Sequence, residues 1–358
     1  MRRTLGVVTG VAIVALAVGL SQQRSIEAQG RGGAAAAEAR AKQEAIEKAT
    51  PQLQVSEEIL PLVMPEHTMG ETEGVSMNSK GHLFVYSRTG KGGSARGGTA
   101  AELFEFDQNY KFVKMLVPDS YGASFAHSVR IDKYDNIWYV DEGSSMIVKL
   151  DPNGVVKMNL GRKPEAIDYL ERFLERGEKD TERYTLGGVG TYNRPTDVAW
   201  DAQDNIYISD GYGNSRFVKL QKDGTWVKAV GTHGSGMDQF NTPHGIASDG
   251  QNIYVADRGN NRIQVYDTNM TYKASYTGVG APWSVQTTPK YIYSGDGTGK
   301  IYRLDRATGK LLGWVQTSLG QGQTGCLIHE LHAVSDTVLI KGSCSEWNVE
   351  KITFKPTT

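Results

Sequence analysis

One feature limits the folds open to this chain more than any other: a short β-rich run recurs six times. Each run follows a polar turn and ends in a second turn that is polar or contains glycine. The six runs are KGHLFVYSR (80–88), DNIWYVDEG (135–143), DNIYISDGY (204–212), QNIYVADRG (251–259), KYIYSGDG (290–297) and DTVLIKGS (336–343). A repeat of about 40–50 residues with several short strands is typical of a β-propeller, with one blade per repeat. The sequence therefore predicts an all-β fold, a six-bladed β-propeller.

Two further segments complete this prediction. The strand-like run at residues 53–63 can add the outer strand of the last blade and close the ring, which removes an open sheet edge. The longest interval between repeats holds residues 163–184, whose apolar side chains recur at helical spacing. We expect an inserted surface helix there, with a functional lid as the alternative.

The N-terminal region has the composition of an export signal followed by a tether. Two arginines precede an apolar run at residues 5–20, and small residues follow it. This order is typical of a secretory signal, so we expect a signal peptide over residues 1–29 and an exported protein, periplasmic or extracellular. An uncleaved membrane anchor is the alternative. Residues 30–51, rich in Ala and Glu, predict a linker or helix, which leaves residues 52–358 for the propeller.

The charge balance of the chain limits the kinds of partner it can attract. The chain has 39 Lys+Arg against 40 Asp+Glu, a formal net charge of −1, which offers no attraction to nucleic acid or an anionic membrane. We therefore expect no nucleic-acid partner and no membrane contact beyond an uncleaved signal anchor. We also expect a monomer.

Cys326 and Cys344 are the two cysteines of the chain. In an oxidising compartment they predict one disulfide, and two free buried thiols are the alternative.

Three of the seven histidines occupy one position in alternate blades, at the start of the inner strand. That position holds, in chain order, Glu73, His127, Thr196, His244, Trp283 and His329. Inner strands line the axis of a propeller and alternate blades of six are about 120° apart, so the three imidazoles should converge at one mouth of the channel. Three nitrogen ligands with an open fourth position are typical of catalytic zinc. His332 competes as third ligand, and the spacing to the following strand favours His329.

The loop after each second strand returns to the same mouth. These loops carry Arg88, Asp141, Tyr212, Asp257 and Arg258. Two arginines and a tyrosine beside a metal suit a small-molecule or peptide substrate with a terminal carboxylate. Asp141 and Asp257 are interpreted as ordinary turn residues, and Arg216 and Arg262 as structural.

At these residues the sequence resembles the NHL-type six-bladed propellers, and among them the peptidyl-α-hydroxyglycine α-amidating lyases. The matching stretches are RPTDVAWDAQDNIYISDGYGNSR (194–216) and TPHGIASDGQNIYVADRGNNRIQ (242–264), with weaker matches at HSVRID (127–132) and LGRKPE (160–165). The resemblance covers residues 70–355 and implies a lyase that splits a C-terminal α-hydroxyglycine into a peptide amide and glyoxylate.

The resemblance also implies roles for single residues. The zinc ligands would be His127, His244 and His329, and the base Tyr212. Arg88 and Arg258 would bind the substrate, Arg88 also acting in catalysis. A structural calcium ion would take backbone oxygens of Val75 and Val129 and the side chain of Glu330, where the family usually has Asp. Gly213 stands where animal members have a cysteine, so that family disulfide is absent.

The chemistry of a carbinolamide agrees with these residues. Its C–N bond breaks once the hydroxyl loses a proton and the nitrogen gains one. Zinc would acidify the hydroxyl or polarise the developing carbonyl, and a tyrosine whose pKa is lowered by metal and arginine could take the proton. The main alternative function is a non-catalytic NHL propeller that binds a peptide, protein or glycan. A calcium-dependent lactonase or esterase is a third, although histidines occupy half of the axial positions where such sites need oxygen ligands.

Overall fold

The computed structural model describes residues 37–88, 101–118, 120–161, 188–318 and 325–356. The expected signal peptide and the expected inserted helix at residues 163–184 lie outside the described residues. The chain divides into two units, Met1–Ala49 and Thr50–Thr358. In the first unit, residues 37–48 form a helix. Within the described parts of the chain, no helix combines the length and apolar character that crossing a bilayer requires.

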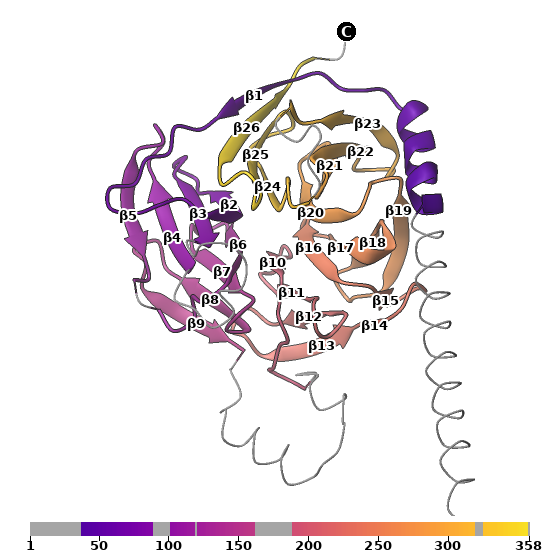
Figure 1. Cartoon of the computed structure of the whole chain (residues 1–358). Coiled ribbons are helices and arrows are strands. Elements are labelled where there is room, and N and C mark those ends of the chain that lie inside the picture. Colours follow the sequence, from indigo (N-terminus) through magenta and orange to yellow (C-terminus); the bar gives the residue numbers. More distant parts are fainter. Residues whose placement is uncertain (1–36, 89–100, 119, 162–187, 319–324, 357–358) are drawn as a thin grey trace, which may run out of the picture. The chain divides into compact units, whose positions relative to one another are not determined.

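The second unit contains six four-stranded antiparallel sheets arranged around a central axis (Figure 1), which confirms the six-bladed β-propeller. Blades are numbered here by the chain order of their inner strands. Blade 1 consists of β2 (Glu71–Met77), β3 (Leu83–Arg88), β4 (Ala101–Phe106) and β5 (Phe112–Leu116). Blade 2 consists of β6 (Ala126–Ile131), β7 (Ile137–Asp141), β8 (Met146–Leu150) and β9 (Val156–Leu160). Blade 3 consists of β10 (Asp197–Trp200), β11 (Ile206–Asp210), β12 (Arg216–Leu220) and β13 (Trp226–Val230).

The second half of the ring repeats this plan. Blade 4 consists of β16 (Pro243–Ser248), β17 (Asn252–Asp257), β18 (Arg262–Asp267) and β19 (Tyr272–Thr277). Blade 5 consists of β20 (Pro282–Thr287), β21 (Tyr291–Asp296), β22 (Lys300–Asp305) and β23 (Leu311–Gln316). Blade 6 consists of β24 (Glu330–Ala333), β25 (Val338–Gly342), β26 (Val349–Phe354) and β1 (Val55–Ile59). A short parallel pair, β14 (Thr232–His233) and β15 (Gln239–Phe240), and a 3-10 turn, η1 (Arg258–Asn260), lie outside the blades.

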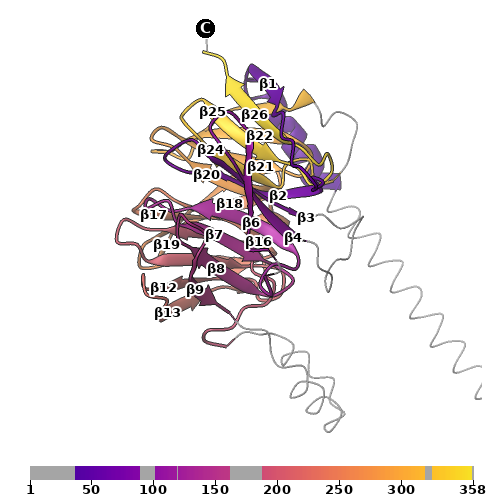
Figure 2. The same ribbon diagram turned by 90° about the vertical axis from the view of Figure 1, so that its left-hand side faces the viewer.

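The ring closes as the sequence predicted. β1, from the beginning of the propeller, pairs antiparallel with β26 from its end, with Val55 opposite Phe354. Blade 6 is therefore built from both ends of the unit, and the edge of β26 that faces away from the axis is paired with β1. Figure 2 shows the blades from the side, with the inner strands β2 and β6 of neighbouring blades next to each other.

The recurring polar turns and strand ends have a physical cause. In blade 2 the Asp132 carboxylate accepts the backbone N–H groups of Tyr134 and Asn136, which forms an Asx turn between the inner and second strands. The same pattern recurs at Asp107, Asp151, Asp201 and Asp267. The carboxylates of these aspartates accept the backbone N–H groups of the turns, which have no strand partner. A polar turn with an aspartate therefore recurs along the sequence and marks the repeat.

In blades 2, 3 and 4, a buried aspartate at the end of the second strand fixes the loop that leads to the inner strand. Asp141 accepts the backbone N–H of Phe125 at 2.7 Å, and Asp257 accepts that of Asn241 at 2.8 Å. Arg262 binds Asp257 at 2.8 Å, as Arg216 binds Asp210 at 2.9 Å. The interpretation of these residues as structural therefore holds, and the loops place the inner-strand starts at one mouth of the channel.

Candidate metal centre and active site

The structure brings His127, His244 and His329 together on the axis. Their side chains are buried, and their ring centroids are 4.6, 4.7 and 5.0 Å apart. One ligand nitrogen of each lies within 4.8 Å of the others. His332 lies outside this group, with Nδ1 3.3 Å from Ser76 Oγ. The six residues at this position, which we call the histidine layer, are Glu73, His127, Thr196, His244, Trp283 and His329.

Each histidine of the layer is oriented by the next blade. Nδ1 of His127 lies 2.6 Å from the carbonyl oxygen of Thr196. Nδ1 of His244 lies 2.7 Å from that of Trp283, and Nδ1 of His329 lies 2.6 Å from that of Glu73. A carbonyl oxygen only accepts, so each Nδ1 carries a proton, and Nε2 is the ring nitrogen left to face the other two histidines. Metal-binding histidines in proteins are held in the same way.

Two observations show that these residues suit a divalent metal. Nε2 of His127 is buried without a hydrogen-bond partner. Nε2 of His329 lies 2.8 Å from the Glu73 carboxylate, which is itself fully buried. A lone pair and a carboxylate at that separation repel each other unless a proton or a metal ion neutralises them. Three imidazoles beside a carboxylate are a donor set that zinc accepts.

The electrostatics favour the neutral imidazole that a metal requires. Burial, together with the nearby His329 and Arg88, holds the pKa of His127 well below its usual range. Burial and the Arg258 guanidinium do the same to the pKa of His244. Burial by itself would raise the pKa of Glu73, but His329 and Arg88 outweigh it and hold this pKa below its ordinary value.

Tyr212 lies directly beside the histidines. Its hydroxyl is 3.1 Å from Nε2 of His244 and accepts a hydrogen bond from Arg258 Nη1 at 3.2 Å. The Arg194 guanidinium lies over its ring, 4.5 Å from the centroid. We expected a metal and an arginine to lower the pKa of Tyr212; burial raises this pKa, with Arg258 opposing the shift.

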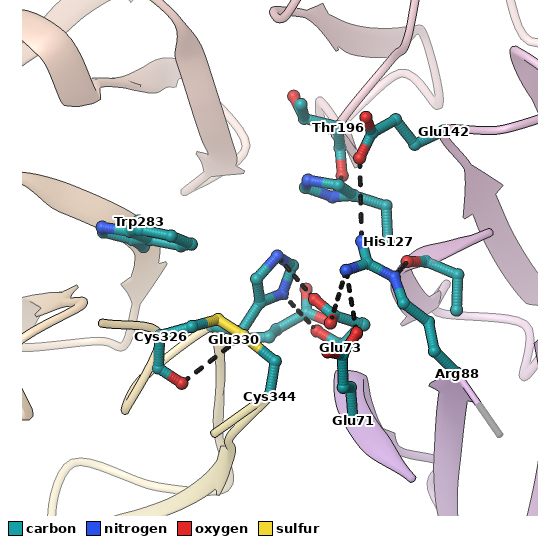
Figure 3. Close-up of polar contacts among 12 residues, drawn as sticks. Glu71, Glu73, Arg88, His127, Glu142, Thr196, Trp283, Cys326, Glu330 and Cys344 are labelled. Atoms are coloured by element: carbon teal, nitrogen blue, oxygen red, sulfur yellow. Dashed lines mark hydrogen bonds and ion pairs between the residues drawn. A yellow bond between two sulfur atoms is a disulfide. The ribbon is translucent and has the colours of Figure 1, made fainter. Parts of the chain in front are cut away.

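The two predicted substrate-binding arginines differ sharply. Arg88 lies among three glutamates, with Nη1 3.2 Å from Glu71 and 2.8 Å from Glu73, and Nη2 3.6 Å from Glu142 (Figure 3). Its Nε also donates to the carbonyl of Ala126 at 2.8 Å. Its guanidinium therefore orients protein carboxylates, including the one beside His329.

Arg258 makes different contacts. Its guanidinium stacks 4.2 Å from the Trp283 ring centroid and bonds the Tyr212 hydroxyl. Among the described residues, no ion pair joins Arg258 to a carboxylate. Of the two arginines, Arg258 is the one available to an anionic substrate.

The predicted disulfide joins Cys326 to Cys344, with Cα atoms 5.5 Å apart. It lies next to Glu73 and His329, because ligand atoms of Glu73, Cys326 and His329 are within 4.8 Å of one another (Figure 3). A small cavity of about 10 Å³ lies among the three histidines, Trp283 and the inner strands. It has room for about one water molecule or ion.

The residues matched to a calcium site also meet on the axis. Glu330 Oε2 accepts the backbone N–H of Val75 at 3.0 Å and that of Val129 at 3.4 Å. The structure adds residues that sequence reasoning missed: Glu73 as a contact of His329, the Arg194–Glu142 pair beside Tyr212, and Arg130 next to Glu330. The one available signal was a charged residue at an axial position, as at Glu73.

Fold and site together define a six-bladed β-propeller with a three-histidine axial centre. Residues 240–266 match the NHL repeat. These residues contain His244 and Arg258, so the matched repeat contributes directly to the site.

Comparison with individual proteins extends this likeness to most of the chain. It is 25% identical over 284 residues to a probable peptidyl-α-hydroxyglycine α-amidating lyase of Caenorhabditis elegans, covering 71% of this chain and 76% of that protein. It is 27% identical over 240 residues to human NHL repeat-containing protein 3, covering 64% and 62%. A solved gluconolactonase from Xanthomonas campestris superposes with a TM-score of 0.57 at 14% identity, covering 86% and 95% of the two chains. That last likeness concerns the fold alone.

Proposed function

We propose that this protein is a metal-dependent lyase that cleaves a C-terminal α-hydroxyglycine, a carbinolamide, into an amide and glyoxylate. The observation that carries the proposal is the set of three Nδ1–carbonyl hydrogen bonds, which turn three Nε2 atoms toward one point beside Tyr212. The named lyase among the similar proteins supports it. The disulfide supports an exported protein, periplasmic or extracellular.

The residues that would hold zinc are His127, His244 and His329. When bound, zinc would supply Lewis-acid stabilisation of the negative charge that develops on the substrate oxygen. Glu73 keeps His329 oriented through its backbone carbonyl, and Arg88 holds the Glu73 side chain in place.

Tyr212 is placed to accept the hydroxyl proton of the substrate. As that proton leaves, the C–N electron pair moves to nitrogen, Tyr212 returns the proton to that nitrogen, and the carbon becomes the aldehyde of glyoxylate; no redox partner is needed. Arg258 lies 3.2 Å from the Tyr212 oxygen, so its charge stabilises the tyrosinate form. The same guanidinium is placed to bind the substrate carboxylate.

The test combines zinc analysis with glyoxylate release from α-hydroxyhippurate. We expect one zinc per chain and glyoxylate production. Tyr212→Phe should reduce turnover by about 10²–10⁴-fold, the usual range for loss of an acid–base group, with zinc content and melting temperature unchanged. Tyr254→Phe is the matched control, because its hydroxyl bonds Asp249 in blade 4 away from the axis.

The outcomes separate the alternatives. Zinc without glyoxylate release would rule out this reaction and leave the three-histidine site with another substrate. Absence of zinc together with absence of turnover would favour a binding propeller. A Tyr212→Phe variant that turns over normally would remove tyrosine from the mechanism.

A further inference from the structure

Directly inside the histidine layer, the next residue of each inner strand forms a second layer, which we call the carboxylate layer. Its members are Gly74, Ser128, Asp197, Gly245, Ser284 and Glu330. Only blades 3 and 6 contribute charged residues. These blades lie opposite each other in the ring (Figure 1), so Asp197 and Glu330 face each other across the axis.

The Arg130 guanidinium joins these two acids. Its Nη2 lies 2.6 Å from Asp197 Oδ2 and 2.5 Å from Glu330 Oε1. Nε donates to Asp197 Oδ1 at 2.8 Å and Nη1 to the carbonyl of Leu331 at 2.9 Å. All three side chains are buried, and every guanidinium nitrogen has a partner.

The remaining bonds of the two acids reach the other blades. Glu330 accepts the backbone N–H groups of Val75 in blade 1 and Val129 in blade 2. Asp197 accepts the N–H of Ile246 in blade 4 at 3.0 Å. Gly74 permits this approach, because a Cβ there would lie 2.4 Å from the nitrogen of Val129. The ion cluster thus links five of the six inner strands.

These contacts do not suit the calcium ion that the family resemblance implied. Calcium takes six to eight oxygen ligands. Here one oxygen of Glu330 faces a guanidinium and the other faces two N–H groups, which are donors. Val75 and Val129 therefore meet Glu330 through amides instead of completing an oxygen cage with it.

We infer that the Arg130 guanidinium is the channel cation of this propeller, in the place of a calcium ion, so that the ring is stable without calcium. The inference concerns the ring and does not depend on the lyase activity. Its physical basis is that a planar guanidinium satisfies two opposed carboxylates with directed hydrogen bonds, as a bound ion would satisfy them with coordination.

The first test uses the unaltered protein, dialysed against calcium-free buffer with zinc present. We expect no calcium by elemental analysis and a melting temperature unchanged by millimolar calcium. A bound ligand raises the melting temperature by mass action. Stoichiometric calcium, or a melting temperature that rises with calcium, would overturn the inference.

The second test is Arg130→Met, which leaves two buried carboxylates without a cation. We expect a melting temperature lower by on the order of 10 °C, and partial recovery on addition of calcium but not of magnesium. Arg216→Met, which removes a buried arginine on β12 from its partner Asp210 on β11, is the matched control and should lose stability with no calcium response. An Arg130→Met variant as stable as the wild type, or one indifferent to calcium, would contradict the inference. If it does not fold, the calcium content of the unaltered protein still decides.

Discussion

The histidine layer and the carboxylate layer lie one residue apart on the same six strands, yet their polar groups are satisfied to different degrees. In the histidine layer, Nε2 of His127 lacks a hydrogen-bond partner, and the carboxylate of Glu73 has only ion-pair contacts, with Arg88 and His329. In the carboxylate layer, each oxygen of Asp197 and Glu330 lies against a donor. A buried polar atom without a partner is costly. The histidine layer therefore favours a bound ligand, whereas the acids of the carboxylate layer are paired by groups of the protein itself.

The difference teaches how one repeat can supply both a site and its support. The carbonyl groups of blades 1, 3 and 5 bind the histidines of blades 6, 2 and 4, which leaves Nε2 atoms for an ion. One residue further along, the backbone N–H groups bind carboxylates and lock the strands together. Function and stability should therefore separate by layer when single residues are changed.

The largest effect is expected from removing a metal ligand from the histidine layer. His244→Ala removes one of three nitrogen ligands, and zinc affinity should fall by more than the roughly 10–100-fold typical of losing an outer-shell partner, with loss of turnover. A competition titration with a chromophoric zinc chelator measures this. His82→Ala is the control, since His82 bonds Glu105 outside the layer. Unchanged zinc affinity in His244→Ala would mean that the three histidines do not form the metal site.

The next largest effect is expected from removing a charge from the carboxylate layer. Asp197→Asn leaves Arg130 with one charged partner in place of two, and should lower the free energy of unfolding by about 3–5 kcal/mol. Urea unfolding at neutral pH measures the loss. Asp204→Asn, which removes a partly exposed ion pair with Lys133, should cost under about 1 kcal/mol. Equal losses in the two variants would contradict the distinction between the layers, as would loss of zinc from folded Asp197→Asn.

The smallest effect concerns His332, which lies outside both layers. Burial and then Arg130 lower its pKa to about 3, against about 6.5 in the unfolded chain. The unfolded state then binds the proton first, so stability is full above pH 6.5 and falls as the pH drops toward 3. Between pH 7.5 and 5 this histidine should cost about 2 kcal/mol.

His332→Asn tests that prediction, because it removes the titrating group and keeps a polar atom near Ser76. Urea unfolding at the two pH values should show a smaller loss in the variant than in the wild type. An equal loss in both proteins would assign the acid sensitivity to other groups, among them His127 and His244, whose pKa values are also lowered by burial.

The sequence by itself determined the blade count, the closure of the ring and the alternation of histidines. These features follow from local chemistry: Asx turns at residues such as Asp132 recur in blades 1 to 4, and strand period fixes which side chains face the axis. The Cys326–Cys344 pairing followed from there being only two cysteines.

Only the tertiary structure decided what each axial residue contacts. Arg88 and Arg258 are equivalent candidates along the chain, but the fold places Arg88 among three glutamates and Arg258 beside Tyr212. The role of Arg130 could not be predicted from the sequence of its own strand, because its partners Asp197 and Glu330 come from blades 3 and 6. Contacts across the axis join residues up to about two hundred positions apart, and such pairings depend on the closed ring instead of on local pattern.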